Sequence, residues 1–305
     1  MNFDKLKGTI VAVALGDALG APHEFRHNKA EYTGKLEHNV VLFNRFQGES
    51  VYPVGSITDD TQMTMIILNH IVNNKGYYPE KIVLEYEKWA TTAKMMGKNT
   101  RELFKGVTTH KGYTSRYNKK FIDTSINEWT QSNGSLMRCS PFVIFNDYNA
   151  LQTDVKLTNP HPINIESGFI YMFVMRNLLI NDKLPDIDEL FKYTNQPAIK
   201  DMIMDVKTRM ARPISDKSVK GWVVTALYCA LYSIYHIPTF KEAAEYFIKQ
   251  KGDTDTNCAI LGGLYGARDG FNKLYLENVY NIDLILKTNK ELANLDYLIG
   301  LAVTV

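Results

Sequence analysis

Two short acidic segments carry the residues best suited to chemistry. They are Thr58-Asp59-Asp60-Thr61 and Asp253-Thr254-Asp255-Thr256, and each precedes a helical pattern. A single Asp or Thr at such a position caps a helix by accepting hydrogen bonds from free N–H groups. Two adjacent carboxylates exceed what a cap requires, because like charges about 4 Å apart repel by roughly 1–4 kcal/mol. Taken alone, the first segment is therefore compatible with a helix cap or with a cation site.

The second segment favours the cation interpretation. It is not a calcium loop, because Cys258 and Leu264 stand where such a loop needs Gly and Glu. It also differs from the Asp-x-Asp of aspartyl-nucleophile phosphatases, because residues 240–251 before it read as a helix and not as a buried strand. In an extended or turning backbone, two carboxylates one residue apart can converge on one ion.

The charge of the two segments predicts how many ions they would bind. Together they carry four negative charges, on Asp59, Asp60, Asp253 and Asp255. Two divalent cations would neutralise these charges. Carboxylate and hydroxyl oxygens, with no His in either segment, favour Mg²⁺ or Mn²⁺ over zinc. Two such ions about 3.5–4 Å apart can bind a sugar diol and activate a water molecule.

Three further positions offer polar groups. Glu24 follows a stretch rich in small residues, which lets backbones approach closely, but it reads equally well as a solvated loop carboxylate. The turn Asn133-Gly134-Ser135 offers amide and hydroxyl donors suited to a phosphate or a ribose. It also matches a glycosylation sequon, which matters only in a secreted protein. His161 lies between two prolines in a setting typical of a rigid binding loop, whereas the other histidines read as structural.

The elements that must position these residues are predicted to be helices. Apolar residues repeat at helical spacing near the start of the chain and again over 63–71 and 82–89. Further helices are expected over 166–179, 188–193, 220–235, 240–249 and 257–268. No run alternates as a half-buried strand does, and no Asn-Gly turn joins two β-rich segments. The pattern predicts an all-α protein with a single domain over residues 1–305.

Composition is typical of a folded globular protein. Of the 305 residues, 45% are hydrophobic and 22% are charged, which argues against a disordered chain. The net charge of +2 supplies no excess of cations for a dedicated nucleic-acid surface. The three cysteines are far apart and odd in number, which argues against a disulfide framework and fits a reducing compartment.

Two apolar segments resemble targeting or membrane sequences. Residues 5–21 resemble a signal peptide, but Asp17 interrupts the run, which continues smoothly into residues 22–24. Residues 221–237 are uncharged and, at 17 residues, reach the lower limit of a membrane span. Their Thr, Ser, His and Tyr side chains favour a buried core helix. We therefore expect no membrane partner, a cytoplasmic location and a monomer.

Several motifs, taken in order, resemble those of the ADP-ribosylglycohydrolase family. These are helical dimetal enzymes that include the glycohydrolase reactivating dinitrogenase reductase. The motifs are GDALGAPHE (16–24), GSITDDTQM (55–63), NGSLMR (133–138), LTNPHP (157–162) and GDTDTN (252–257). They cover the chain to about residue 268, and TDDTQ with GDTDTN is a highly specific pair. The resemblance implies an orthogonal helical bundle that hydrolyses the bond between ADP-ribose and a modified side chain or another acceptor.

The resemblance also implies roles for individual residues. Two Mg²⁺ ions, with Mn²⁺ as a substitute, would be held by Thr58, Asp59, Asp60, Asp253, Asp255 and Thr256. Glu24 would lie at the reaction centre with Asp60. The bound ADP-ribose would lie along Asn133, Gly134 and Ser135, with Asn159 and His161 nearby. The family usually has Thr-His-Pro where this chain has Thr158-Asn159-Pro160, which could alter specificity or slow turnover.

Two other functions stay open at this point. One is an ADP-ribose-binding protein with little catalysis, which the substitution at Asn159 keeps open. The other is a metal-dependent phosphoesterase acting on a nucleotide. The complete set of acidic residues favours the hydrolase. An arginine, a serine, a nucleic-acid end and a small-molecule acetyl ester all remain open as the acceptor.

Overall fold

A computed structural model describes residues 2–24, 31–44, 48–93, 95–122, 130–277 and 280–304. The elements of the first half are α1 (Phe3–Glu24), β1 (Val40–Asn44), β2 (Gly48–Tyr52), α2 (Asp59–Asn74), α3 (Pro79–Ala90), α4 (Lys98–Phe104), α5 (His110–Tyr117) and α6 (Tyr148–Thr158). Those of the second half are α7 (Pro162–Asn181), α8 (Pro197–Thr208), α9 (Val223–His236), α10 (Phe240–Gln250), α11 (Thr254–Leu276), α12 (Ile282–Thr288) and α13 (Leu295–Thr304). Short 3₁₀ or π-helical turns are η1 (Asn118–Ile122), η3 (Asn133–Ser135), η4 (Ser140–Ile144), η5 (Ile187–Tyr193) and η6 (Lys290–Leu292). The predicted all-α class is confirmed.

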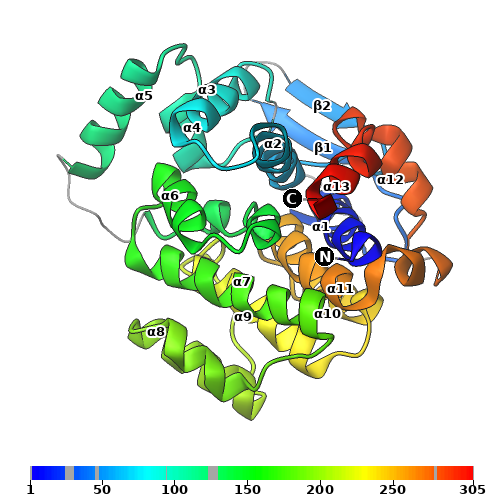
Figure 1. Cartoon of the computed structure of the whole chain (residues 1–305). Helices are drawn as coiled ribbons and strands as arrows, with labels where there is room; N and C mark the ends of the chain where they lie inside the picture. The colour runs from blue at the N-terminus through cyan, green and yellow to red at the C-terminus, as the bar shows by residue number, and fades with distance from the viewer. Residues whose placement is uncertain are drawn as a thin grey trace.

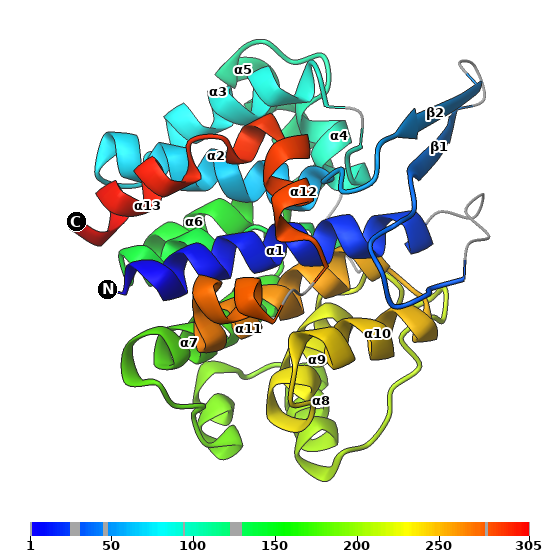
Figure 2. The same cartoon turned by 90° about the vertical axis from the view of Figure 1, so that its right-hand side faces the viewer.

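Helices α1 and α11 lie at the centre of the protein. Helices α2, α3 and α13 lie on one side of them, and α7, α9 and α10 lie on the other (Figure 1, Figure 2). Helix α1 is buried without interruption over residues 8–22, and α11 is buried over residues 254–267. A helix buried all round must be apolar or small on every face. This explains why both sequences are dense in Ala, Gly, Val, Ile and Leu.

The two central helices run antiparallel and meet backbone to backbone. A methyl group added at Gly16 would lie 2.0 Å from the carbonyl oxygen of Cys258. One added at Gly20 would lie 2.2 Å from the carbonyl oxygen of Thr254. The small residues of α1 repeat every four positions, at Gly8, Ala12, Gly16 and Gly20. Because residues four apart share one helix face, this repeat keeps the whole contact free of bulky side chains. The start of α11 is thereby fixed beside the end of α1.

The sequence analysis missed the hairpin of β1 and β2. Residues 40–43 form a continuous apolar run and do not alternate, so the segment lacks the period of a half-buried strand. The strands pair antiparallel, with Val40 opposite Tyr52 and Asn44 opposite Gly48. The hairpin projects from the helical body (Figure 2).

The predicted helices are present, with shifted bounds. Residues 188–193 lie in the 3₁₀ turn η5 and not in an α-helix. Helix α11 begins at Thr254, before the predicted start at Asn257, so Asp255 and Thr256 belong to its first turn. The acidic pattern of that segment therefore lies on a helix and not in a loop.

Among the described residues, α7 is long and apolar enough to cross a membrane by length and composition. In the protein, 61% of its most apolar window is buried. The other apolar segment, 221–237, forms α9, and residues 223–231 are buried. The expectation of a buried core helix is correct there.

We expect Gly20→Ala to destabilise the protein by about 1–3 kcal/mol, because the added methyl group meets backbone that cannot move aside. Thermal unfolding measures the change. Gly300→Ala in α13 is the control, since a methyl group there has no described atom within 4 Å. It should be neutral or stabilising by roughly 0.5–1 kcal/mol. Equal effects of the two substitutions would contradict the close backbone contact.

Candidate functional site

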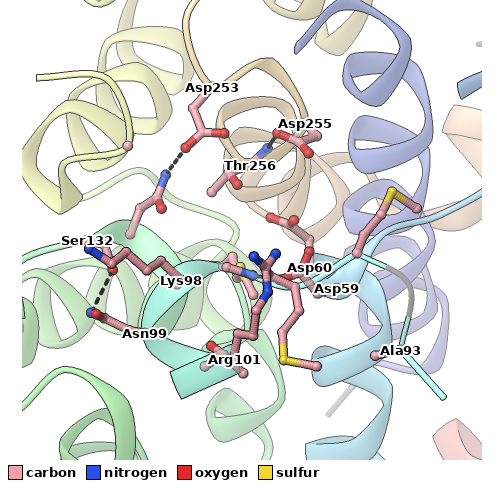
Figure 3. Close-up of a pocket in the computed structure, with 18 of the residues that line it drawn as sticks. Asp59, Asp60, Ala93, Lys98, Asn99, Arg101, Ser132, Asp253, Asp255 and Thr256 are labelled. Carbon is pink, nitrogen blue, oxygen red and sulfur yellow. Dashed lines mark hydrogen bonds between the residues drawn. The ribbon is translucent and has the colours of Figure 1, made fainter. Parts of the chain in front are cut away.

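A cavity of about 1310 Å³ opens where the end of α1 meets the start of α11. Residues of α2, β2, η3 and α11, and of the segment that leads into α4, line its walls. Figure 3 shows that the two acidic segments meet there, with Asp59 and Asp60 on one side and Asp253 and Asp255 on the other. Glu24 also lines the cavity. The structure thus brings together five carboxylates from three segments far apart in the chain.

Asp17 fixes the start of α2. This fully buried side chain accepts hydrogen bonds from the backbone N–H groups of Thr58 (2.9 Å) and Thr61 (3.1 Å). It also accepts hydrogen bonds from both threonine hydroxyls. These contacts hold the backbone on either side of Asp59 and Asp60. The Thr58 hydroxyl in turn accepts a hydrogen bond from the backbone N–H of Asp60 and so caps α2.

The first two acids of α2 have different surroundings. Asp59 accepts a hydrogen bond from the backbone N–H of Gly97 (2.9 Å), which ties it to the segment before α4. Oδ2 of Asp60 lies 2.9 Å from the hydroxyl of Thr58. Oδ1 of Asp60 is buried and has no hydrogen-bond partner among the described residues. A buried carboxylate oxygen without a donor is costly unless a cation satisfies it.

The second acidic segment lies close to Glu24. The carboxylate oxygens of Glu24, Asp253 and Asp255 approach within 4.8 Å of one another. Asp253 accepts a hydrogen bond from the side-chain amide of Asn133 (2.9 Å). Glu24 also lies 3.4 Å from the ammonium group of Lys220. This arrangement could bind one cation between three carboxylates.

Burial and repulsion raise the pKa values of these acids. The pKa of Glu24 rises to about 7, chiefly through burial and then through the charge of Asp253, while Lys220 opposes the rise. Burial, followed by the charges of Glu24 and Asp253, holds the pKa of Asp255 well above its usual range. The close approach of these carboxylates explains the repulsion, and either a proton or a cation would relieve it.

The two aspartates of the first acidic segment also have raised pKa values. Burial, followed by the charges of Asp17 and Asp59, holds the pKa of Asp60 well above its usual range. Burial also raises the pKa of Asp59. The unpartnered oxygen of Asp60 and the mutual repulsion of the acids both fit a site built for cations. Carboxylate and hydroxyl oxygens are the ligands that Mg²⁺ and Mn²⁺ prefer. Of the two predicted threonine ligands, Thr256 lines the same cavity, whereas Thr58 is buried and is not among the lining residues.

The residues predicted to contact ADP-ribose are only partly gathered at the cavity. Asn133, Gly134 and Asn159 line it. Ser135 and His161 are not among the lining residues. The hydroxyl of Ser135 is buried against the amide of Asn164 (3.2 Å). His161 instead caps α7, with Nδ1 accepting a hydrogen bond from a backbone N–H (3.1 Å).

Asn159 has a clear structural role. Its amide nitrogen donates to the carbonyl oxygens of Thr130 (2.9 Å) and Ser132 (3.2 Å), and its oxygen accepts from the hydroxyl of Thr158 (2.7 Å). These bonds hold the backbone that leads into Asn133. Asn159 therefore supports the turn beside the cavity.

Sequence analysis missed two residues at this site. Asp17 was considered only as an interruption of an apolar run, yet a carboxylate inside a buried helix needs a specific partner. Lys220 was considered only as the first residue of a predicted helix. Its contact with Glu24 joins positions 196 apart, and no local pattern could indicate it.

Comparison with known proteins places the chain in a family. The family model described as ADP-ribosylglycohydrolase matches residues 2–298. The chain belongs to the ADP-ribosylglycohydrolase family. A protein of Acanthamoeba polyphaga mimivirus, provisionally named ADP-ribosyl glycohydrolase, is 24% identical to this family member over 86% of each chain. The ADP-ribosyl-(dinitrogen reductase) glycohydrolase of Rhodospirillum rubrum is 22% identical, over 98% of this chain and 97% of its own.

A solved structure shares the fold of this ADP-ribosylglycohydrolase. The structure is titled "ADP-ribosylglycohydrolase-related protein complex" and matches with a TM-score of 0.70 at 19% identity. The match covers 99% of this chain and 97% of the other. The predicted family, helical fold and class of glycosidic-bond hydrolase are therefore confirmed.

Glu24→Gln should stabilise the metal-free ADP-ribosylglycohydrolase at high pH. Because the pKa of Glu24 rises from 4.5 to about 7, the folded state binds this proton more tightly than the unfolded state does. Ionised Glu24 thus destabilises the fold above about pH 7, and the penalty fades as the pH falls toward 4.5. In EDTA, urea unfolding should show the variant more stable by on the order of 1–3 kcal/mol at about pH 8 and equal at about pH 4.5. Equal stability at both pH values would contradict a buried, repelled Glu24.

Asp17→Asn should weaken Mn²⁺ binding at least about tenfold while the helical fold is retained. The new amide nitrogen cannot accept the N–H groups of Thr58 and Thr61, so the start of α2 loses its anchor. Isothermal titration with Mn²⁺ measures the affinity, and circular dichroism checks the fold. Asp147→Asn, at the cap of α6, makes the same chemical change outside the cavity lining and should leave Mn²⁺ binding unchanged. Parent-like affinity in Asp17→Asn would show that this anchor does not position the ligands.

Proposed function

We propose that this protein is a Mg²⁺-dependent hydrolase that cleaves the glycosidic bond between ADP-ribose and a modified protein side chain or another acceptor. One observation carries the proposal beyond the family assignment. Carboxylates about 190 positions apart in the sequence line one cavity, together with Glu24. The relative from Rhodospirillum rubrum is named ADP-ribosyl-(dinitrogen reductase) glycohydrolase, and the relative from Serratia proteamaculans is named ADP-ribosylarginine hydrolase. Both names agree with a modified protein as substrate.

Six oxygen-bearing side chains would hold two Mg²⁺ ions, with Mn²⁺ as a substitute: Thr58, Asp59, Asp60, Asp253, Asp255 and Thr256. Once held by the protein, the ions would coordinate a ribose diol and lower the pKa of a water molecule. Asp17 would keep the first three ligands in place through its bonds to Thr58 and Thr61. The unpartnered oxygen of Asp60 supports its assignment as a ligand at the reaction centre.

Glu24 would act as the general acid/base. Its pKa of about 7 suits proton exchange near neutral pH, because both protonation states are then available. The carboxyl group would take a proton from the attacking water or return one to the leaving group. Lys220 limits the rise of this pKa and holds the carboxylate toward the cavity. Cleavage should pass through an oxocarbenium-like transition state, as in other glycoside hydrolysis.

The ADP-ribose would lie along turn η3. Asn133 and Gly134 line the cavity and would meet the diphosphate or a ribose. Asn159 would contribute chiefly by holding the preceding backbone. Ser135 and His161 do not line the cavity. They would contribute indirectly, Ser135 through its contact with Asn164 and His161 by capping α7.

The cysteines bear on the location of the enzyme in the cell. All three cysteines are free and buried, which supports a reducing location such as the cytoplasm. We further propose that residues 1–305 form one domain that acts as a monomer.

Asp255→Ala should reduce release of ADP-ribose from a modified protein at least about 100-fold, because the variant loses a carboxylate at the centre of the cluster. Chromatography detects the released ADP-ribose with Mg²⁺ and with EDTA, and the EDTA sample of the parent should also be inactive. Asp147→Asn is the control and should retain parent activity. Full activity of Asp255→Ala, or of the parent in EDTA, would overturn the proposal.

The same assay separates the other two functions. Tight ADP-ribose binding by the parent without any release would support a binding protein. Phosphate release from ADP-ribose, with the label still on the protein, would support a phosphoesterase. Substrates with differently linked ADP-ribose then identify the acceptor.

A further inference from the structure

The cavity meets the hairpin along the outer edge of β2. Three consecutive residues of this strand, Ser50, Val51 and Tyr52, line the cavity wall. Successive side chains of a strand point to opposite faces of a sheet, so a cavity against one face would contact alternate residues. Contact with three residues in a row places the cavity at the edge of the strand. From the described part of β1, Leu42 alone lines the cavity.

The outer edge of β2 has no partner strand at Ser50 and Val51. Among the described residues, the sheet has two strands, and β2 pairs with β1 along one side. Neither Ser50 nor Val51 forms a backbone hydrogen bond with a described residue outside the hairpin. Consecutive residues direct their backbone groups to opposite sides of a strand, so one of these two presents its N–H and C=O groups at the outer edge. Such an edge is a template for another extended chain.

Strand β2 also lacks features that block pairing at exposed edges. Such edges often carry Lys or Pro, and residues 48–52 contain neither. The one charged residue of the strand, Glu49, lies outside the cavity lining. The hairpin projects from the helical body (Figure 2), and an isolated pair of strands is only marginally stable. A chain added to β2 would complete a three-stranded sheet and stabilise the hairpin.

Two parts of the cavity wall, β2 and residues 95–97, are joined to the acidic residues. Asp59 follows Val51 by eight residues, which span at most about 29 Å. Its carboxylate also accepts the N–H of Gly97 (2.9 Å). Met95 and Met96, just before Gly97, line the cavity and offer adaptable apolar contacts. A chain extended along β2 would therefore find contacts for its side chains within reach of the acidic end.

We propose that β2 binds an extended segment of the ADP-ribosylated protein as a third strand, and that this pairing places the modified side chain at the acidic end. The occupant is a polypeptide, because a peptide backbone offers N–H and C=O groups at the spacing of a strand edge. Backbone pairing depends little on sequence, since every residue except proline offers the same groups. The enzyme would thus act on many proteins, provided that the modified residue lies in an extended or unfolded segment. This inference rests on the proposed function for the identity of the attached group.

Fluorescence anisotropy tests the pairing with a labelled ten-residue peptide of alternating Thr and Val that carries ADP-ribose on a central arginine. The measurement uses the Glu24→Gln protein with Mg²⁺, so that cleavage is slow. The peptide should bind at least about tenfold more tightly than ADP-ribosylarginine, because it adds backbone hydrogen bonds.

Methylation of single backbone nitrogens of the peptide provides the matched control. Only every second N–H group of an added strand can point toward β2. Methylating two neighbouring residues, in separate peptides, should remove the gain in affinity at one position and retain it at the other. Hydrogen exchange locates the added strand. The amide of Ser50 or Val51, whichever does not pair with β1, should exchange at least about tenfold more slowly when the peptide is bound.

Three outcomes would overturn the inference. They are equal affinity for the peptide and for ADP-ribosylarginine, the same effect of methylation at both positions, and unchanged exchange at both Ser50 and Val51. Release of ADP-ribose by the parent protein is scored separately. Peptide pairing without release from any modified protein contradicts the proposed function alone, whereas release without pairing contradicts this inference alone.

Discussion

The direct contact between the backbones of α1 and α11 is the constraint on which the site depends. Glu24 ends one helix, and Asp253 and Asp255 begin the other, so their separation is set by how closely the helices pack. Glycine at positions 16 and 20 allows this approach because any larger residue would meet a carbonyl oxygen. Asp17, on the same helix, then fixes the start of α2. Three acidic segments are thus positioned by one helix pair.

This geometry buries several carboxyl groups close together, where their ionised forms are unfavourable without a counter-charge. Buried acids that repel one another must be protonated or must meet a cation, since burial in a low dielectric disfavours charge. The raised pKa values of Glu24 and Asp255 favour protonation, which is the first solution, and the unpartnered oxygen of Asp60 leaves room for the second. Stability and cation binding are therefore linked in this protein. Folding brings these like charges together at a cost in free energy. A bound cation would offset part of that cost.

The sequence predicts the parts of this structure that are local. Helical spacing indicates the buried helices, and an Asp-Asp pair between two threonines indicates an unusual helix start, because both signals lie within a few residues. The hairpin was missed because residues 40–43 lack alternation, and its formation depends on the pairing of β1 with β2. The contacts of Asp17 and Lys220 could not be predicted from spacing, because each joins segments distant in the chain. His161 shows the opposite error: its two flanking prolines indicate a rigid loop, but that rigidity serves the cap of α7.

Averages over the chain hid the charge pattern of the cavity. A net charge of +2 is the sum of a basic segment, residues 95–122, and an acidic remainder. Only the fold brings cations of that segment into the cavity that the acidic residues line: Lys98, Arg101, Lys105 and Lys120. Opposite charges at its two ends create a field along its length, which orients a ligand whose own charge is uneven. An ADP-ribose conjugate is such a ligand, because its terminal ribose is uncharged and its phosphates are not. The acidic end would repel phosphates, so the field favours entry of the terminal ribose toward Glu24 and Asp60. The polarity that raises the pKa values of the carboxylates would thus also favour the orientation in which the terminal ribose of the proposed substrate reaches them.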